Sequence, residues 1–120
     1  MIKTFQDIGV WQKAHELTLS VYKFTRKYPR EETFGLVSQI RRCTVSIGSN
    51  IAEGYRRRTS KDRMNFYNIA EGSLEELEYQ LILSRDLSYI SLEEYNFLFP
   101  RAEEVGKMLC SWKKGVKDVF

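Results

Sequence analysis

Hydrophobic residues recur along this chain at alternating spacings of three and four, the spacing of one face of an α-helix. Four stretches carry this pattern, from about residues 7 to 28, 33 to 57, 60 to 87 and 91 to the C-terminus. Their apolar stripes are, in order, Val10, Ala14, Leu17, Val21, Phe24 and Tyr28; Leu36, Ile40, Cys43, Ile47, Ile51 and Gly54; Met64, Tyr67, Ala70, Leu74, Leu77, Leu81 and Ser84; and Tyr95, Leu98, Ala102, Val105, Leu109, Trp112, Val116 and Val119. We expect these stripes to form the core.

Residues that favour helix ends separate the first three stretches. Asp7 and Thr33 are candidate N-caps of the first and second helices, and Thr59 or Ser60 of the third. Pro29 is expected to end the first helix, because proline cannot continue a helix from the preceding turn.

The fourth stretch opens with Ser91 and Glu94, at the spacing of a capping box. Pro100 lies inside this stretch. Because proline removes one helical hydrogen bond, we expect a kink near residues 96–99 unless the helix starts later.

The arrangement of these stretches predicts an all-α protein, an antiparallel up-down-up-down four-helix bundle. No segment alternates apolar and polar residues with a period of two, so no sheet is expected. A long coiled coil is the alternative for such spacing, and the three breaks argue against it. No linker-like segment divides the chain, so residues 1–120 are expected to form a single domain.

Composition favours a cytoplasmic, soluble protein. Apolar residues make up 42% of the chain and charged residues 29%, a globular balance. The N-terminal segment lacks the pattern of a signal peptide, and no apolar run reaches the roughly 20 residues of a membrane helix. Cys43 and Cys110 both fall in apolar helical patterns, so we expect buried thiols in a reducing compartment.

Charge is distributed unevenly along the chain. The net charge is only +3, yet residues 41–63 carry seven basic groups against two acids, and residues 71–104 carry nine acids against two arginines. This asymmetry can serve an anionic partner or a contact between unlike faces of neighbouring copies. Composition alone does not decide between them.

The second helix has too few charges for a helix with one solvated face, because residues 43–52 contain none. Small residues follow one flank of this helix, and a polar stripe that includes Gln39, Arg42 and Arg57 follows another. Because these flanks lie beside a charge-free run, we interpret them as a self-association surface. The third helix offers polar partner residues near Gly72. The predicted interface residues are Val45, Ser46, Gly48, Asn50, Ala52, Glu53, Ser73 and Glu76. We expect the Asn50 and Glu53 side chains to be hydrogen-bonded, to backbone groups or to residues such as Ser73. A solvated polar face is the plainer interpretation of the stripe.

Several segments resemble the four-helix-bundle proteins of the 23S rRNA intervening-sequence family. They are Val10 to Ala14, Phe34 to Leu36, Gln39 to Arg42, Val45 to Ile47, Ser49 to Gly54 and Gly72 to Glu78. Members of that family usually have proline where this chain has Gly48, and commonly alanine where it has Cys43.

The resemblance implies a pentameric, barrel-shaped assembly of four-helix protomers in a bacterial protein. The genes of such proteins occur within large-subunit rRNA genes and elsewhere in bacterial genomes. A related bundle partners a reverse transcriptase and nucleic acid, so RNA or a nucleic-acid enzyme is an implied partner, besides the protein itself.

Catalysis is not expected. A di-metal bundle needs two Glu-x-x-His motifs, and the chain has one histidine, His15, preceded at that spacing by Gln12. His-Glu-x-x-His, Cys-x-x-Cys, a phosphate-binding glycine loop and a nucleophile elbow are all absent from the sequence. We therefore predict no enzyme activity, no catalytic or cofactor-binding residues, no cofactor or metal, no small-molecule substrate and no membrane partner.

Nucleic-acid binding is the sharper hypothesis for the turn between the second and third helices. The turn gathers Arg56, Arg57, Arg58, Lys61 and Arg63, which could neutralise phosphates. Tyr55 and Tyr67 lie next to them as candidate stacking faces. Two alternatives remain. One is a solvated basic turn in which Arg56 and Arg57 complement the dipole of the second helix. The other is an adaptor protein whose basic turn meets an acidic protein surface.

Overall fold

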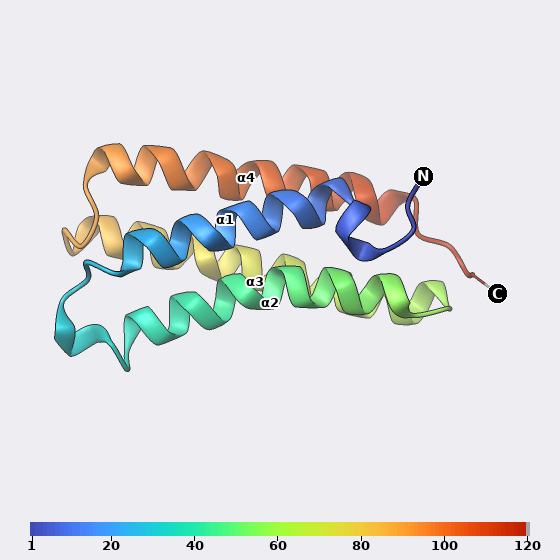
Figure 1. The fold of residues 1–120 in the computed structure, drawn as a ribbon, viewed down its shortest axis with the longest axis horizontal. Helices are drawn as coiled ribbons and strands as arrows, with labels where there is room; N and C mark the ends of the chain where they lie inside the picture. The colour runs from blue at the N-terminus through green and yellow to red at the C-terminus, as the bar shows by residue number, and fades with distance from the viewer. Residues whose placement is uncertain (120) are drawn as a thin grey trace.

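The computed structural model describes residues 1–119 and contains four helices: α1 (Gly9–Thr25), α2 (Leu36–Arg56), α3 (Ser60–Asp86) and α4 (Leu92–Lys114). Two short 3-10 turns, η1 (Phe5–Asp7) and η2 (Arg30–Glu32), precede α1 and α2. Consecutive helices run in opposite directions along a bundle of 49 × 25 × 20 Å (Figure 1). The predicted all-α four-helix bundle is confirmed. Residue 120 of the expected domain lies outside the described residues.

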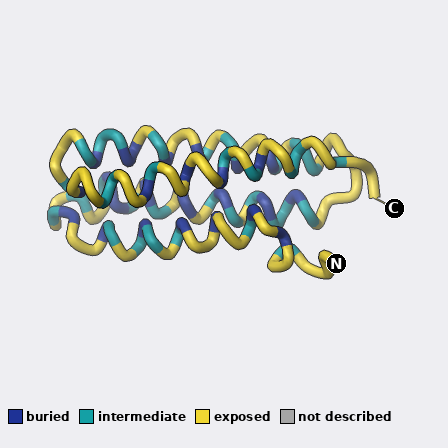
Figure 2. Tube along the Cα trace, turned by 90° about the horizontal axis from the view of Figure 1, so that it is seen from above, coloured by how far each residue is buried: buried dark blue, intermediate teal, exposed yellow. Residues whose placement is uncertain are grey.

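The core is built largely from the predicted stripes, but the fourth was predicted too long: α4 ends at Lys114, and Val119 is 43% exposed. All six stripe residues of α2 are buried, and Val10, Ala14, Leu17 and Val21 are buried on α1. The buried positions follow the inner side of each helix along the whole bundle (Figure 2). Burial of these side chains is the main stabilising contribution, about 1.5–3 kcal/mol for each large aliphatic residue.

The first helix differs from the expectation at both ends. Asp7 does not cap α1: its Oδ2 accepts hydrogen bonds from the backbone N–H groups of Lys3 (2.8 Å) and Thr4 (3.1 Å), within the capping box of η1. These bonds, the Lys3 bond first, lower the pKa of Asp7. Ile8 is the N-cap of α1, and the helix ends at Thr25, before Pro29 is reached.

Thr33 does not cap α2. The η2 turn brings Glu32 under the helix, and its Oε1 accepts a hydrogen bond from the N–H of Leu36 (3.1 Å). The other carboxylate oxygen of Glu32 accepts a bond from the Tyr89 hydroxyl (2.8 Å). A glutamate four residues ahead of the helix therefore performs the role predicted for threonine.

The last two helices begin where the sequence indicates. Thr59 caps α3, and Ser91 forms the predicted capping box with Glu94. Pro100 lies inside α4, which is helical from Leu92. One turn before it, the Phe97 carbonyl accepts a hydrogen bond from the guanidinium of Arg101 (2.7 Å).

One of the two cysteines is not where it was expected. Cys43 is buried, but Cys110 is exposed on α4, one position past the buried Leu109. A single residue turns a helix by about 100°, so a position next to the stripe can face outward. Within residues 1–119, no helix is both long enough and apolar enough to cross a membrane.

Candidate nucleic-acid interface and assembly surfaces

Three separate segments meet at one end of the bundle. The turn between α2 and α3 lies at the same end as the N-terminus and the C-terminal tail (Figure 1). The tail is held against the turn by two hydrogen bonds, from Val119 N to Arg58 O (2.6 Å) and from Ser60 N to Asp118 Oδ1 (2.5 Å). The antiparallel topology thus gathers residues from distant parts of the sequence.

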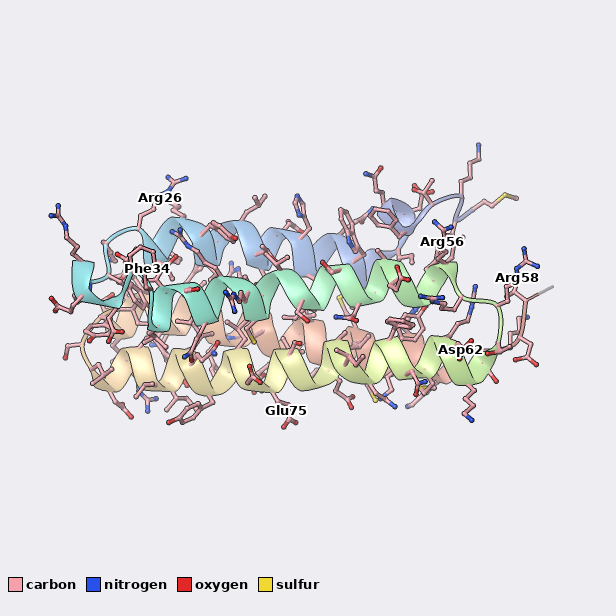
Figure 3. The ribbon with its side chains drawn as sticks, turned by 90° about the horizontal axis from the view of Figure 1, so that it is seen from below. Arg26, Phe34, Arg56, Arg58, Asp62 and Glu75 are labelled. Atoms are coloured by element: carbon pink, nitrogen blue, oxygen red, sulfur yellow. The ribbon has the colours of Figure 1, made fainter. Side chains whose placement is uncertain are left out.

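This end of the bundle is strongly basic. Residues 1–9, 53–65 and 111–119 together carry nine lysines and arginines against four acids. Arg56, Arg58 and Lys61 are exposed, and within residues 1–119 they form no ion pair. Arg58 and Arg56 project from the bundle at this end, with Asp62 beside the turn (Figure 3). The charges of Arg56, Arg58 and Lys61 are therefore open to solvent in the described chain.

The other two predicted residues are engaged within the protein. Arg63 donates from Nε to the Arg57 carbonyl (2.7 Å) and from Nη2 to the Tyr55 carbonyl (2.9 Å). Arg57 pairs with Glu53 on its own helix, and its guanidinium lies 4.8 Å from the Phe66 ring centroid. Arg63 therefore satisfies carbonyls at the C-terminal end of α2, the place where the dipole alternative put Arg56 and Arg57.

The stacking part of the hypothesis is wrong for Tyr67. Its ring is fully buried, because it packs against α2 where Gly54 has no side chain: an added Cβ there would lie 2.6 Å from Tyr67 Cε1. Tyr55 is half-buried, with the Arg63 guanidinium 5.7 Å from its ring centroid. Neither ring is an open stacking surface.

The sequence interpretation missed the basic residues that the chain ends contribute. Lys3, Lys114 and Lys117 are exposed at the same end of the bundle. Lys113 forms an ion pair with Glu71, with Nζ 3.2 Å from Oε1. The predicted up-down topology could have found them, since it places the end of the fourth helix beside the turn between the second and third.

An apolar groove of about 520 Å³ runs between α1 and α2 on the outside of the bundle. The predicted small residues Val45, Gly48 and Ala52 lie on its α2 side. The α1 side and the segment before it supply larger groups: Phe5, Trp11, His15, Thr18, Leu19 and Tyr22. Trp11 and His15 are stacked, with their ring centroids 5.1 Å apart. We call this feature the α1–α2 groove; its role as an interface stays a prediction.

The polar flank of α2 faces α3. Ser73 Oγ donates to Ser46 Oγ (2.9 Å), and Asn50 Nδ2 donates to the carbonyl (2.8 Å) and hydroxyl (3.0 Å) oxygens of Ser46. Asn50 is therefore hydrogen-bonded as predicted, although through Ser46 and not directly to Ser73. Glu53 is bonded to Arg57, and Glu76 lies beside Ser46 and Ser73 in a shallow depression.

The buried thiol of Cys43 lies next to this polar flank. Its Sγ is 2.7 Å from the Ser73 carbonyl, to which it donates. Burial, followed by the nearby Glu76 carboxylate, raises the pKa of Cys43 to about 12. A thiol that keeps its proton is a poor nucleophile and metal ligand. Across residues 1–119, no group of three or more His, Cys, Asp or Glu side chains is arranged to hold a metal ion.

The family assignment follows from the match of the sequence to known proteins. Residues 6–111, which span all of the bundle except the end of α4, match the model of the 23S rRNA-intervening sequence protein. The chain belongs to this family. No curated protein matches the sequence significantly.

A solved structure supports the fold of this intervening-sequence family member. The chain described here is similar to the crystal structure of a protein with unknown function from the S23 ribosomal protein family of Bacteroides thetaiotaomicron VPI-5482. The two chains are 32% identical with a TM-score of 0.78, and the match covers 88% of this chain and 98% of that one. The similarity extends over the whole bundle of the relative.

Proposed function

We propose that this protein is a non-enzymatic, self-associating four-helix-bundle protein that binds RNA through the basic end of the bundle. The observation that carries the proposal is the convergence of the α2–α3 turn with both chain ends into one cationic surface. Arg56, Arg58 and Lys61, with Lys114 and Lys117, are its exposed members. The link of the family to 23S rRNA insertions makes RNA the first nucleic acid to test.

The physical basis is neutralisation of phosphates. Lysine and arginine side chains displace the counterions of a nucleic acid, and each phosphate contact contributes roughly 0.7–0.9 to the slope of log affinity against log salt concentration. Tyr67 is buried and Tyr55 is half-buried, which leaves little aromatic surface for base stacking. Binding is therefore expected to depend strongly on salt and weakly on sequence.

The test measures binding of labelled RNA by fluorescence anisotropy at several salt concentrations. The triple variant Arg56→Ala, Arg58→Ala, Lys61→Ala is expected to lower affinity for every sequence and to reduce the slope by about 2–3. The matched control, Lys23→Ala, Arg26→Ala, Arg30→Ala, removes the same charge away from that end and should bind nearly as the parent does. Sedimentation of both variants separates a loss of binding from a change in assembly.

A second candidate function is that of an assembly or adaptor protein without nucleic-acid affinity. The α1–α2 groove favours it, because its apolar lining is open to the outside of the bundle and offers a surface for another protein. A pentamer is the assembly that the family resemblance suggests. RNA binding that is undetectable at low salt, together with a stable oligomer, would select this function.

A further inference from the structure

The C-terminal tail, residues 115–119, is fastened to the turn between α2 and α3. After α4 ends at Lys114, the chain continues along the end of the bundle where this turn lies (Figure 1). Asp118 Oδ1 accepts a hydrogen bond from the backbone N–H of Ser60, with the oxygen and nitrogen 2.5 Å apart. The next residue, Val119, donates from its backbone N–H to the Arg58 carbonyl (2.6 Å). The tail is thus held at two adjacent residues, and one of the two contacts is made by a carboxylate.

The carboxylate of Asp118 occupies a place that also suits a phosphate. Ser60 is the first residue of α3, and the N–H of a first residue has no acceptor within its own helix. The N-cap residue Thr59 accepts its side-chain bond from the N–H of Asp62 instead (3.1 Å). The free N–H groups and the partial positive charge at the start of a helix bind carboxylates and phosphates alike. An anionic group of the chain itself is therefore already bound at the start of α3.

The cations around this carboxylate are those assigned to RNA binding in the proposed function. Arg56, Arg58 and Lys61 are exposed, and in the described part of the chain none of the three forms an ion pair. The tail contacts Arg58 only at its backbone carbonyl, so this contact does not use the guanidinium, which projects from the bundle (Figure 3). A phosphate attracted to these side chains finds the Ser60 N–H already taken by Asp118.

The tail contact lies on the surface of the bundle. Lys117, Asp118 and Val119 are exposed, and the residues that match the family model end at 111, before the tail begins. A hydrogen bond between exposed groups adds little net stability, because water can replace either partner. The tail can therefore leave the turn without disturbing the core of the bundle.

We infer that the C-terminal tail is an autoinhibitory strap, in which Asp118 takes the place of an RNA phosphate at the start of α3. RNA has to displace this carboxylate, whereas Lys114 and Lys117, which precede it, stay close to the turn. The apparent affinity for RNA is then reduced in proportion to the fraction of molecules whose strap is open. The inference rests on RNA binding by the basic end of the bundle, and self-association has no part in it.

The experiment removes one negative charge from the strap, or one from its surroundings. Asp62→Asn is the matched control, because Asp62 is an exposed acid beside the same turn (Figure 3) and its side chain is not part of the tail contact. Its gain in affinity for labelled RNA, measured by anisotropy, is the effect of lost charge alone. Asp118→Asn is expected to exceed this gain by about three- to tenfold, because a strap that is closed most of the time hides the site.

Hydrogen exchange of the Ser60 amide, followed by NMR, reports the strap without RNA. This N–H should be protected in the parent and in Asp62→Asn, and should exchange faster in Asp118→Asn, where its charged acceptor is lost. Equal affinity gains for the two variants would overturn the strap and leave RNA binding intact, as would a Ser60 exchange rate that Asp118→Asn does not change. If neither the parent nor a variant binds RNA at low salt, the proposed function fails, and an inhibitory role of the tail fails with it.

Discussion

Two arginines of the basic segment support the carbonyl ends of helices. Arg41 donates from Nε to Thr25 Oγ1 (3.0 Å) and from Nη2 to the Tyr22 carbonyl (3.3 Å), at the end of α1. Arg63 makes the equivalent bonds at the end of α2. The last carbonyls of a helix lack partners within the helix, and a cation there is also favoured by the helix dipole. These two charges stabilise the fold, so fewer are free for a ligand than the sequence count indicates.

The two cysteines lead to a prediction about thiol reactivity. Cys110 is exposed, whereas Cys43 is buried and its pKa is raised to about 12. Since the thiolate is the reactive form, we expect a thiol reagent at pH 8 to modify Cys110 rapidly and Cys43 only when the protein unfolds. Counting modified thiols in native and denatured protein tests this. The variant Cys110→Ser should have no rapid reaction, and a fast second equivalent in the native parent would contradict the burial of Cys43.

The helices show which parts of the fold can be predicted from sequence. All six residues predicted for the stripe of α2 are buried, because the three-four spacing reports the buried side, although Val37 and Thr44 beside the stripe are buried as well. The end of α1 at Thr25 was not predicted, because the apolar spacing continues to Tyr28 and Pro29 was expected to end the helix. The start of α2 depends on Glu32, which a search for threonine or serine caps overlooks. The sequence therefore predicts faces better than ends, since an end depends on a few capping contacts that several residue types can supply.

The packing of α2 on α3 leads to a prediction about Gly54. An added Cβ there would meet the buried Tyr67 ring at 2.6 Å, whereas at Gly72 it would enter open space. Overpacking costs about 1–3 kcal/mol, and replacing glycine by alanine inside a helix gains about 1 kcal/mol. We expect Gly54→Ala to lower the free energy of unfolding and Gly72→Ala to raise it by up to about 1 kcal/mol. Urea denaturation of the parent and both variants at the same protein concentration measures the difference. Equal effects of the two changes would contradict the close contact.

The basic end is a property of the whole molecule and of no single segment. The sequence shows the arginines of the turn, but the lysines near the C-terminus are more than fifty residues away and join them only through the antiparallel topology. The tail is tied to the turn at Arg58 and Ser60, which fixes Lys117 beside that turn. A sequence search for one basic cluster therefore finds only part of the candidate site, and it does not reveal that Arg63 is hydrogen-bonded to the end of α2.

The last prediction tests whether this end acts as one surface. If RNA contacts the turn and the tail together, the double variant Lys114→Ala, Lys117→Ala should weaken RNA binding, although neither residue belongs to the turn. The salt slope should fall by roughly 0.7–0.9 for each phosphate that is no longer neutralised. The double variant Lys13→Ala, Lys107→Ala removes the same charge from exposed positions along the bundle and serves as the control. Anisotropy titrations of the same RNA at several salt concentrations give both quantities. Identical slopes for the two double variants would confine binding to the turn, and the tail would then be an ordinary solvated end of the chain.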